Sequence, residues 1–206
     1  FMHHLRLGGY ETVLAGKMHF IGPDQLHGFE RRLTTDIFPA NYDLYRPWDV
    51  QGDPPRPANP SNPAMALHLK HAGPVAWSDQ LEYDEEVHYR ALEQLRAYGR
   101  RPAGAGRPWF MCVSYTHPHD PPLITEDYWN RYADTEVPPP EAPPAGYEPH
   151  GSDTWVITYC GIDVARLTPD EIAGARRGYF AMTSYFYDPV GALLAELRRL
   201  GLAGNT

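Results

Sequence analysis

An apolar run between two prolines constrains the fold of this chain more than any other feature. The run is WFMCVSYTH, residues 109–117, and Pro108 and Pro118 close it at its two ends. A short, continuous apolar run bounded by turn residues is typical of a strand that is buried on both faces. The run therefore predicts a fully buried strand in a layered α/β protein.

A second apolar run, Thr12–Ala15, predicts another buried strand. Gly16 then lets the backbone leave the sheet, so that Lys17 and His19 emerge at the carboxyl end of this strand, where open α/β sheets form their ligand sites. The chain has only two lysines, Lys17 and Lys70, among its 18 basic residues. A lysine here suits an anionic oxygen of a sulfate or phosphate, and a histidine beside it can donate to the same group or transfer protons. The alternative is a surface lysine and an ordinary loop histidine.

The turn THPHDPP, residues 116–122, follows the other predicted strand. Its three prolines stiffen the backbone around His117 and His119, and Asp120 lies beside them. Two histidines on a rigid turn at a strand end suit metal ligation or proton transfer. The alternative is a rigid connection whose histidines face solvent.

A third polar segment is TTDIFPANYDLY, residues 34–45. Its acids and aromatic rings could shape a pocket for a small cation. From the sequence alone, packing of a loop is the favoured interpretation.

Two helices have clear signals. The first is predicted over residues 79–98, because its apolar residues recur at spacings of four and three. The last helix is predicted to begin at a capping box of Thr168 and Glu171, with Pro169 in its first turn. Pro189 should kink or break it. The predicted apolar stripes are Tyr83, Val87, Ala91, Leu95 and Tyr98 in the first helix, and Ile172, Ala175, Tyr179, Met182, Phe186, Val190, Leu193, Leu197 and Leu200 in the last.

The remaining segments predict a helix end and two long connections. Residues 1–9 resemble the end of a helix that Gly8 and Gly9 stop. Residues 21–63 predict a long loop, with QGDPPRPANPSNP as a surface excursion, and residues 118–166 predict a proline-rich connector. Strand, helix, strand and helix joined by long loops favour a layered α/β fold.

Composition limits the classes of function. The net charge of −8 argues against a nucleic-acid-binding protein, because no basic stripe is present to neutralise phosphates. The sequence contains no apolar stretch of roughly 18 residues, the length that would predict a membrane span. Cys112 is expected to be a small buried apolar residue, and it forms no CxxC spacing or disulfide framework with Cys160. The ends, FMHHLRLGGY and LAGNT, favour an internal part of a longer protein, and a cytoplasmic location is expected.

The segments GYETVLAGKMHF and THPHDPP together resemble two motifs of the sulfatase family, a Gly-Tyr-x-Thr run that ends in Gly-Lys-x-His and a His-x-Pro-His-x-Pro turn. GPDQLHGFERRLTTDIFPA and YFAMTSYFYDPVGALLAELRRLGLAGNT are similar to the choline-sulfatase branch of that family. That branch usually carries Gly-Trp where this chain has Asp43 and Leu44.

The resemblance implies an alkaline-phosphatase-like layered α/β fold, in which helices flank a central, mostly parallel sheet. Residues 1–206 would form part of one catalytic domain, truncated at both ends. The implied activity is hydrolysis of a small-molecule sulfate ester by a formylglycine, made from cysteine in a Cys-x-Pro-Ser-Arg context, with a calcium ion. Neither cysteine of this chain has that context, so the formylglycine and the calcium ligands are expected outside it.

The resemblance also implies roles for individual residues. Lys17 would hold a sulfate oxygen and assist the leaving group, and His19 would hydrogen-bond the formylglycine diol and assist elimination of sulfate. His119 would contact the sulfate and the leaving oxygen, with His117 as its neighbour. No nucleic-acid or membrane partner is expected, and the full-length protein is expected to form a homo-oligomer.

Three other functions stay open at this point. A phosphodiesterase or phosphonate monoester hydrolase would share the fold and nucleophile. A truncated domain would bind an anion without catalysis. A zinc protein would use His3, His4, His117 and His119, although no HExxH motif or spaced Cys/His set supports it.

Overall fold

The computed structural model describes residues 1–37, 63–102, 104–159, 161 and 166–206. The chain divides into two compact units. Unit 1 comprises Phe1–Val50, Asp79–His117 and Phe186–Thr206, and unit 2 comprises Gln51–Ser78 and Pro118–Tyr185. Three of the predicted site residues, Lys17, His19 and His117, belong to unit 1, and His119 belongs to unit 2.

A parallel sheet of three strands forms the centre of unit 1. The strands are β1 (Glu11–Gly16), β2 (Arg31–Arg32) and β4 (Trp109–Ser114), in the order β2-β1-β4. Both pairings are parallel, and the last residues of β1 and β4, Gly16 and Ser114, are partners in the register. The two strands predicted from the apolar runs are therefore confirmed, and their carboxyl ends meet at one edge of the sheet.

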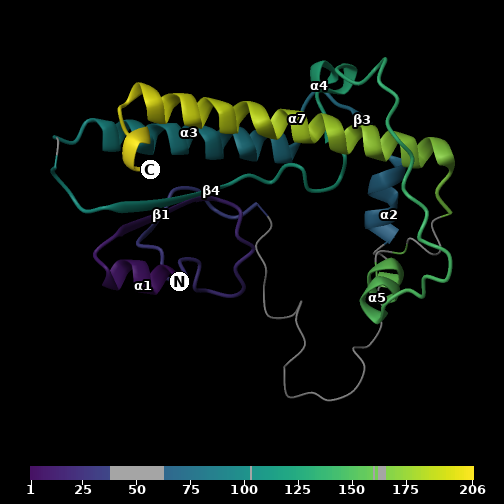
Figure 1. Cartoon of the computed structure of the whole chain (residues 1–206), viewed down its shortest axis with the longest axis horizontal. Helices are drawn as coiled ribbons and strands as arrows, with labels where there is room; N and C mark the ends of the chain where they lie inside the picture. Colours follow the sequence, from purple (N-terminus) through teal and green to yellow (C-terminus); the bar gives the residue numbers. More distant parts are fainter. Residues whose placement is uncertain (38–62, 103, 160, 162–165) are drawn as a thin grey trace. The chain divides into compact units, whose positions relative to one another are not determined.

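Helices cover both faces of this sheet. On one face, Leu14 of β1 packs with Met2 of α1 (Met2–Leu7) and with Phe29. On the other face, Ala15 packs with Val87 of α3 (Asp79–Gly99). Figure 1 shows α1 on one side of β1, and α3 with the yellow end of α7 on the other. Because it is covered on both faces, β1 is buried along its whole length.

The predicted apolar stripe of α3 is confirmed, since all five of its residues are buried. The prediction of a fully buried strand at residues 109–117 is wrong in its burial and its length. Strand β4 ends at Ser114 and is half-buried, because among the described residues it pairs only with β1. Cys112, also half-buried, packs on the face that holds Leu14.

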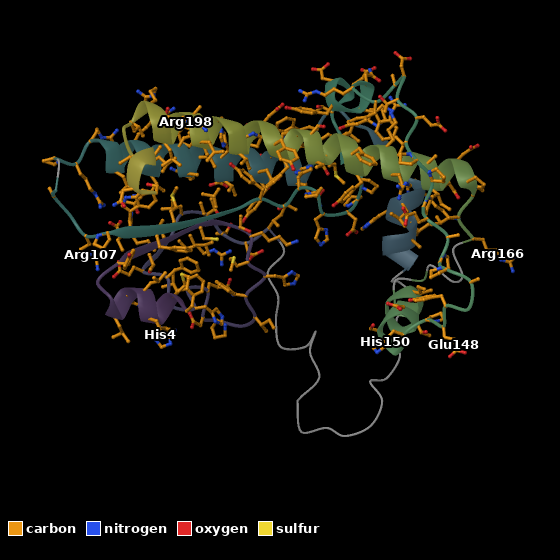
Figure 2. All side chains as sticks on the ribbon, viewed as in Figure 1. His4, Arg107, Glu148, His150, Arg166 and Arg198 are labelled. Carbon is orange, nitrogen blue, oxygen red and sulfur yellow. The ribbon has the colours of Figure 1, made fainter. Side chains whose placement is uncertain are left out.

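A cluster of charges holds the opposite edge of the sheet. Glu11, at the start of β1, accepts hydrogen bonds from Arg31 and Arg101, at 2.6 Å each. Burial raises the pKa of the Glu11 carboxyl, but the two arginines outweigh it and leave the pKa below its ordinary value. Arg107, labelled in Figure 2, pairs in the same region with Glu30 at 2.6 Å.

The last long helix, α7 (Pro169–Arg199), begins at the predicted capping box. The Thr168 N–H donates to Glu171 Oε2 at 2.7 Å, and the Glu171 N–H donates to Thr168 Oγ1 at 3.2 Å. The predicted break at Pro189 is wrong, because the helix continues through this residue. Tyr179, predicted on the apolar stripe, is 54% exposed, whereas Met182 is buried as predicted.

Unit 2 contains a two-stranded parallel sheet of β3 (Gly73–Pro74) and β5 (Leu123–Ile124). Its helices are α2 (Pro63–Lys70), α4 (Glu126–Asn130) and α5 (Gly151–Tyr159), besides residues 169–185 of α7. A Cβ atom at Gly178 would lie 2.8 Å from the Pro122 carbonyl oxygen, so the α7 backbone approaches the loop before β5 closely.

Short elements interrupt the two predicted connections. Strand β2 lies within residues 21–63, and β5, α4 and α5 lie within residues 118–166. The predicted surface excursion lies outside the described residues, except for Pro63, which begins α2. None of these short elements had a clear periodic signal, because each is too short to show a full apolar stripe.

Candidate functional site

Gly16 turns the chain out of the sheet at the carboxyl end of β1. Its φ is +114°, and an added Cβ atom would lie 1.9 Å from the Ser114 carbonyl oxygen, so only glycine fits. The Gly16 N–H donates to Thr34 Oγ1 at 2.9 Å, and the Lys17 N–H donates to Ser114 O at 2.9 Å. The half-buried Lys17 therefore lies at the carboxyl end of β1, as predicted.

A buried carboxylate holds the turn that follows. Asp36 Oδ2 accepts hydrogen bonds from the N–H groups of Met18, at 3.1 Å, and His19, at 2.9 Å. The same oxygen accepts a hydrogen bond from Arg32 at 2.9 Å, and the Asp36 and Arg32 side chains are only 2% and 8% exposed. His19 has a φ of +55° and is exposed. The turn thus presents the His19 side chain from a fixed backbone.

A second buried carboxylate holds the end of β4. Asp84, from α3, accepts hydrogen bonds from the Thr116 N–H at 2.6 Å and the His117 N–H at 3.0 Å. The His117 ring Nδ1 lies 2.7 Å from Asp84 Oδ2, and both side chains are fully buried. Because a carboxylate only accepts, Nδ1 carries the proton in this pair.

The register brings these two turns together. Since Gly16 pairs with Ser114 in parallel strands, Lys17 and His19 leave the sheet at the same edge as His117. This arrangement agrees with the predicted site at two neighbouring strand ends. The interpretation of His117 as a solvent-facing histidine is wrong, because His117 is buried against Asp84.

His119 lies in unit 2 and has different surroundings. Its ring Nδ1 donates to the Asp120 carbonyl oxygen at 2.8 Å and lies 3.1 Å from the Asp120 carboxylate. That carboxylate also lies 2.9 Å from His68 Nδ1 of α2. The His119 side chain is about half exposed, at 47%, so its ring is accessible to a ligand.

An open cavity of about 650 Å³ in unit 1 is lined in part by Asp36, the carboxylate that holds the turn at His19. This volume falls in the usual range of small-molecule pockets. The residues that line it are Gly22, Gln25, Arg32, Leu33, Thr34, Thr35, Asp36 and Glu86.

Sequence reasoning missed Asp36, Arg32 and Asp84. Asp36 lies in the segment TTDIFPANYDLY, for which loop packing is the favoured interpretation, and its burial depends on Met18 and His19, 18 and 17 positions earlier. The cation pocket considered for this segment falls partly on residues 38–45, outside the described residues. Asp84 lies three positions before Val87 and seven before Ala91, so helical periodicity places it within the apolar stripe of α3. A carboxylate at a stripe position was the signal that could have identified it.

Metal and nucleophile are not found among the described residues. No group of three or more His, Cys, Asp or Glu side chains that could hold a metal ion occurs in the described ranges. Burial raises the pKa of the Cys112 thiol, which disfavours the nucleophilic thiolate. Cys160 lies outside the described residues. Among the helices that the structure describes, none is long and apolar enough to cross a membrane.

The fold and the candidate site define an α/β protein with donor side chains at the carboxyl edge of a parallel sheet. The sequence model of the sulfatase family matches residues 1–206. The chain therefore belongs to the sulfatase family. Its fold is accordingly alkaline-phosphatase-like, as the sequence motifs predicted, with parallel strands flanked by helices.

A characterised relative supports the same branch of the family. The chain is 37% identical to choline-sulfatase of Rhizobium meliloti (strain 1021) over 214 residues. The match covers 100% of this chain and 40% of that enzyme. The chain thus spans about 40% of the length of the curated relative that it matches.

Proposed function

We propose that the full-length protein hydrolyses a small-molecule sulfate ester, with choline sulfate as the first substrate to test. The observation that supports this most directly is the meeting of Lys17 and His19 with the His117 turn at one sheet edge, in a chain of the sulfatase family. The 37% identity to choline-sulfatase supports the choice of substrate.

When present, a formylglycine and a calcium ion outside this chain would supply the nucleophilic oxygen and a positive charge for the sulfate. The Lys17 ammonium would donate to a sulfate oxygen and stabilise the charge that develops on the leaving oxygen. His19 would hydrogen-bond the nucleophile and accept a proton during elimination of sulfate. His119 would donate to the sulfate and to the leaving oxygen.

His117 takes a different part from its neighbour. Its ring is fully buried and donates to Asp84, so it orients the turn rather than contacting the ester. The open cavity lined by Arg32, Asp36 and Glu86 would receive the alcohol portion of the substrate. Fixed donors of this kind lower the barrier because they bind the developing charge more strongly than they bind the ground state.

The test is release of inorganic sulfate by the full-length protein from choline sulfate and from an aryl sulfate. Lys17→Ala is expected to lower kcat/KM by roughly 10²–10³-fold, the usual effect of losing one oxyanion donor. Lys70→Ala, which removes the only other lysine, is the matched control and is expected to leave the rate unchanged.

Other outcomes would replace the proposal. Hydrolysis of phosphodiesters or phosphonate monoesters without release of sulfate would make the protein a phosphohydrolase of the same fold. Sulfate binding without turnover of any ester would make it a non-catalytic anion-binding protein. Equal rates for Lys17→Ala and Lys70→Ala would remove Lys17 from the site.

The proposal includes a cytoplasmic homo-oligomer that binds neither nucleic acid nor membranes. Cell fractionation tests the location, and light scattering during gel filtration tests the oligomeric state. A monomer, or recovery in the membrane fraction, would overturn the corresponding part.

A further inference from the structure

Two buried aspartates bind the backbone at equivalent positions beyond two neighbouring strands. Asp36 accepts from the N–H groups of Met18 and His19, the second and third residues after Gly16. Asp84 accepts from the corresponding N–H groups of Thr116 and His117, the second and third residues after Ser114, the register partner of Gly16. The same arrangement therefore occurs twice at one edge of the sheet.

Both carboxylates are almost completely removed from solvent. The Asp36 side chain is 2% exposed and the Asp84 side chain is 0% exposed. A buried carboxylate is costly unless hydrogen bonds and an opposite charge compensate it. The compensating groups here are Arg32, the His117 ring and the backbone N–H groups of the two turns, so the cost of burial is recovered in full only when those turns have this conformation.

Each aspartate also ties its turn to the rest of unit 1. Arg32 pairs with Asp36 at 2.9 Å and donates to the Gly16 carbonyl oxygen at 3.0 Å. It therefore bonds both the last residue of β1 and the carboxylate that holds the turn after it. Asp84 lies on α3, which packs on the sheet, and it binds the His117 ring at 2.7 Å. The backbone that carries Lys17, His19 and His117 is therefore held before any ligand binds.

We infer that Asp36 and Asp84 are positioning residues for hydrolysis of the sulfate ester, an inference that rests on the proposed function. Neither carboxylate contacts the ester. Each fixes one of the two turns at the candidate site, and Asp36 thereby sets the position of His19. A displacement of about 1 Å in such a group can lower a rate by about 100-fold.

The two aspartates use their oxygens differently, and this difference gives a sharp test. Asp36 accepts from Met18, His19 and Arg32 through Oδ2, so an asparagine keeps an acceptor for the two backbone N–H groups but removes the negative charge beside the buried Arg32. Asp84 uses Oδ1 for Thr116 and Oδ2 for His117. An asparagine there keeps one acceptor and turns an NH₂ group towards the other N–H.

The experiment compares steady-state kinetics of full-length variants with the ester that the wild type hydrolyses. Asp36→Ala, Asp84→Ala and Asp84→Asn are expected to lower kcat by about 10- to 100-fold while KM changes much less, because donors in the transition state are displaced. Asp36→Asn is expected to retain a higher kcat than Asp36→Ala, since its carbonyl oxygen can still accept from the two backbone N–H groups. Leu95→Ala, a buried α3 substitution away from the turns, controls for lost stability and should keep wild-type kcat.

A second readout does not depend on activity. Hydrogen exchange of the amides of Met18, His19, Thr116 and His117 is expected to speed up in the two Ala variants and in Asp84→Asn, less in Asp36→Asn than in Asp36→Ala, and not in Leu95→Ala. If the wild type hydrolyses no sulfate ester, the proposed function fails. The exchange rates of these four amides then decide by themselves whether the aspartates hold the turns. Unchanged exchange in Asp84→Ala, or a loss of kcat in Asp36→Asn equal to that in Asp36→Ala, would overturn the inference.

Discussion

A Cβ atom at Gly16 would lie 1.9 Å from the carbonyl oxygen of Ser114, although the two residues are almost a hundred positions apart in the sequence. This short distance means that the backbone leaving β1 lies directly against the end of β4. It explains why the chain can place Lys17 at this edge only if the residue before it has no side chain.

Gly16→Ala is expected to lower the free energy of unfolding by at least about 3 kcal/mol, because it adds a backbone clash to an unfavourable positive φ. Urea unfolding of the full-length protein measures it. Gly9 separates the two causes, since its φ is +86° and no atom lies within 4 Å of an added Cβ. Gly9→Ala is expected to cost only about 1 kcal/mol. Equal costs at the two positions would show that the contact with Ser114 contributes nothing.

His117→Ala and His119→Ala are expected to differ in stability, although sequence motifs placed both histidines in the site. His117→Ala leaves the buried Asp84 without its ring partner, so a loss of about 2–4 kcal/mol is expected. His119 is half exposed, and its substitution is expected to change stability by no more than about 0.5 kcal/mol. Urea unfolding curves of the two variants test this difference, and the reverse order would contradict the assigned surroundings.

The capping box of α7 gives a prediction about helix stability. Thr168→Ala removes the hydroxyl that accepts from the Glu171 N–H, and it is expected to cost about 1 kcal/mol. Thr125 is a matched control, because it occupies the N-cap of α4 without a side-chain hydrogen bond. Its substitution by alanine should have a smaller effect on the melting temperature. A larger effect at Thr125 would mean that the box does not stabilise α7.

Glu196 predicts a dependence of stability on pH. Hydrogen bonds from Arg199 and Arg96 lower the pKa of its carboxyl from 4.5 to about 2. A lowered pKa in the folded state stabilises the fold above pH 4.5, and this contribution disappears as the pH falls from 4.5 towards 2. The difference in unfolding free energy between wild type and Glu196→Gln should therefore be largest at neutral pH and shrink in acid.

A control for this pH effect is available on α3. Glu93 pairs with Arg90 at 3.2 Å, but both side chains are about half exposed, so solvent screens the pair. Glu93→Gln is expected to change stability little at any pH. A pH-independent difference for Glu196→Gln would show that its two arginine bonds do not stabilise the folded state.

The elements predicted correctly are those whose signals are local. The stripe of α3 repeats every three or four residues, and the capping box of Thr168 and Glu171 spans a single turn. Gly16 and the apolar run before it likewise occupy adjacent positions. Each of these can be read from a short window, because the interactions that define it lie within one element.

The features that were missed depend on contacts between distant segments. Asp84 is buried because the Thr116 and His117 N–H groups need an acceptor, and no window of the sequence contains all three residues. Tyr179 fits the apolar period of α7 but is exposed, because burial depends on which elements cover the helix. The positions of Lys17 and His19 at a strand end were predictable, whereas the hydrogen bonds that hold their turn were not.

The register of the central sheet has a consequence for the order of events during synthesis. Glu11 pairs with Trp109 and Gly16 with Ser114, so the two paired strands are almost a hundred residues apart in the sequence. Strand β1 is therefore synthesised long before β4. Closing so large a loop costs chain entropy, which is repaid only when the distant strand arrives. Until then the apolar residues of β1 have no β4 beside them, and their partners are the elements synthesised earlier, α1, β2 and α3.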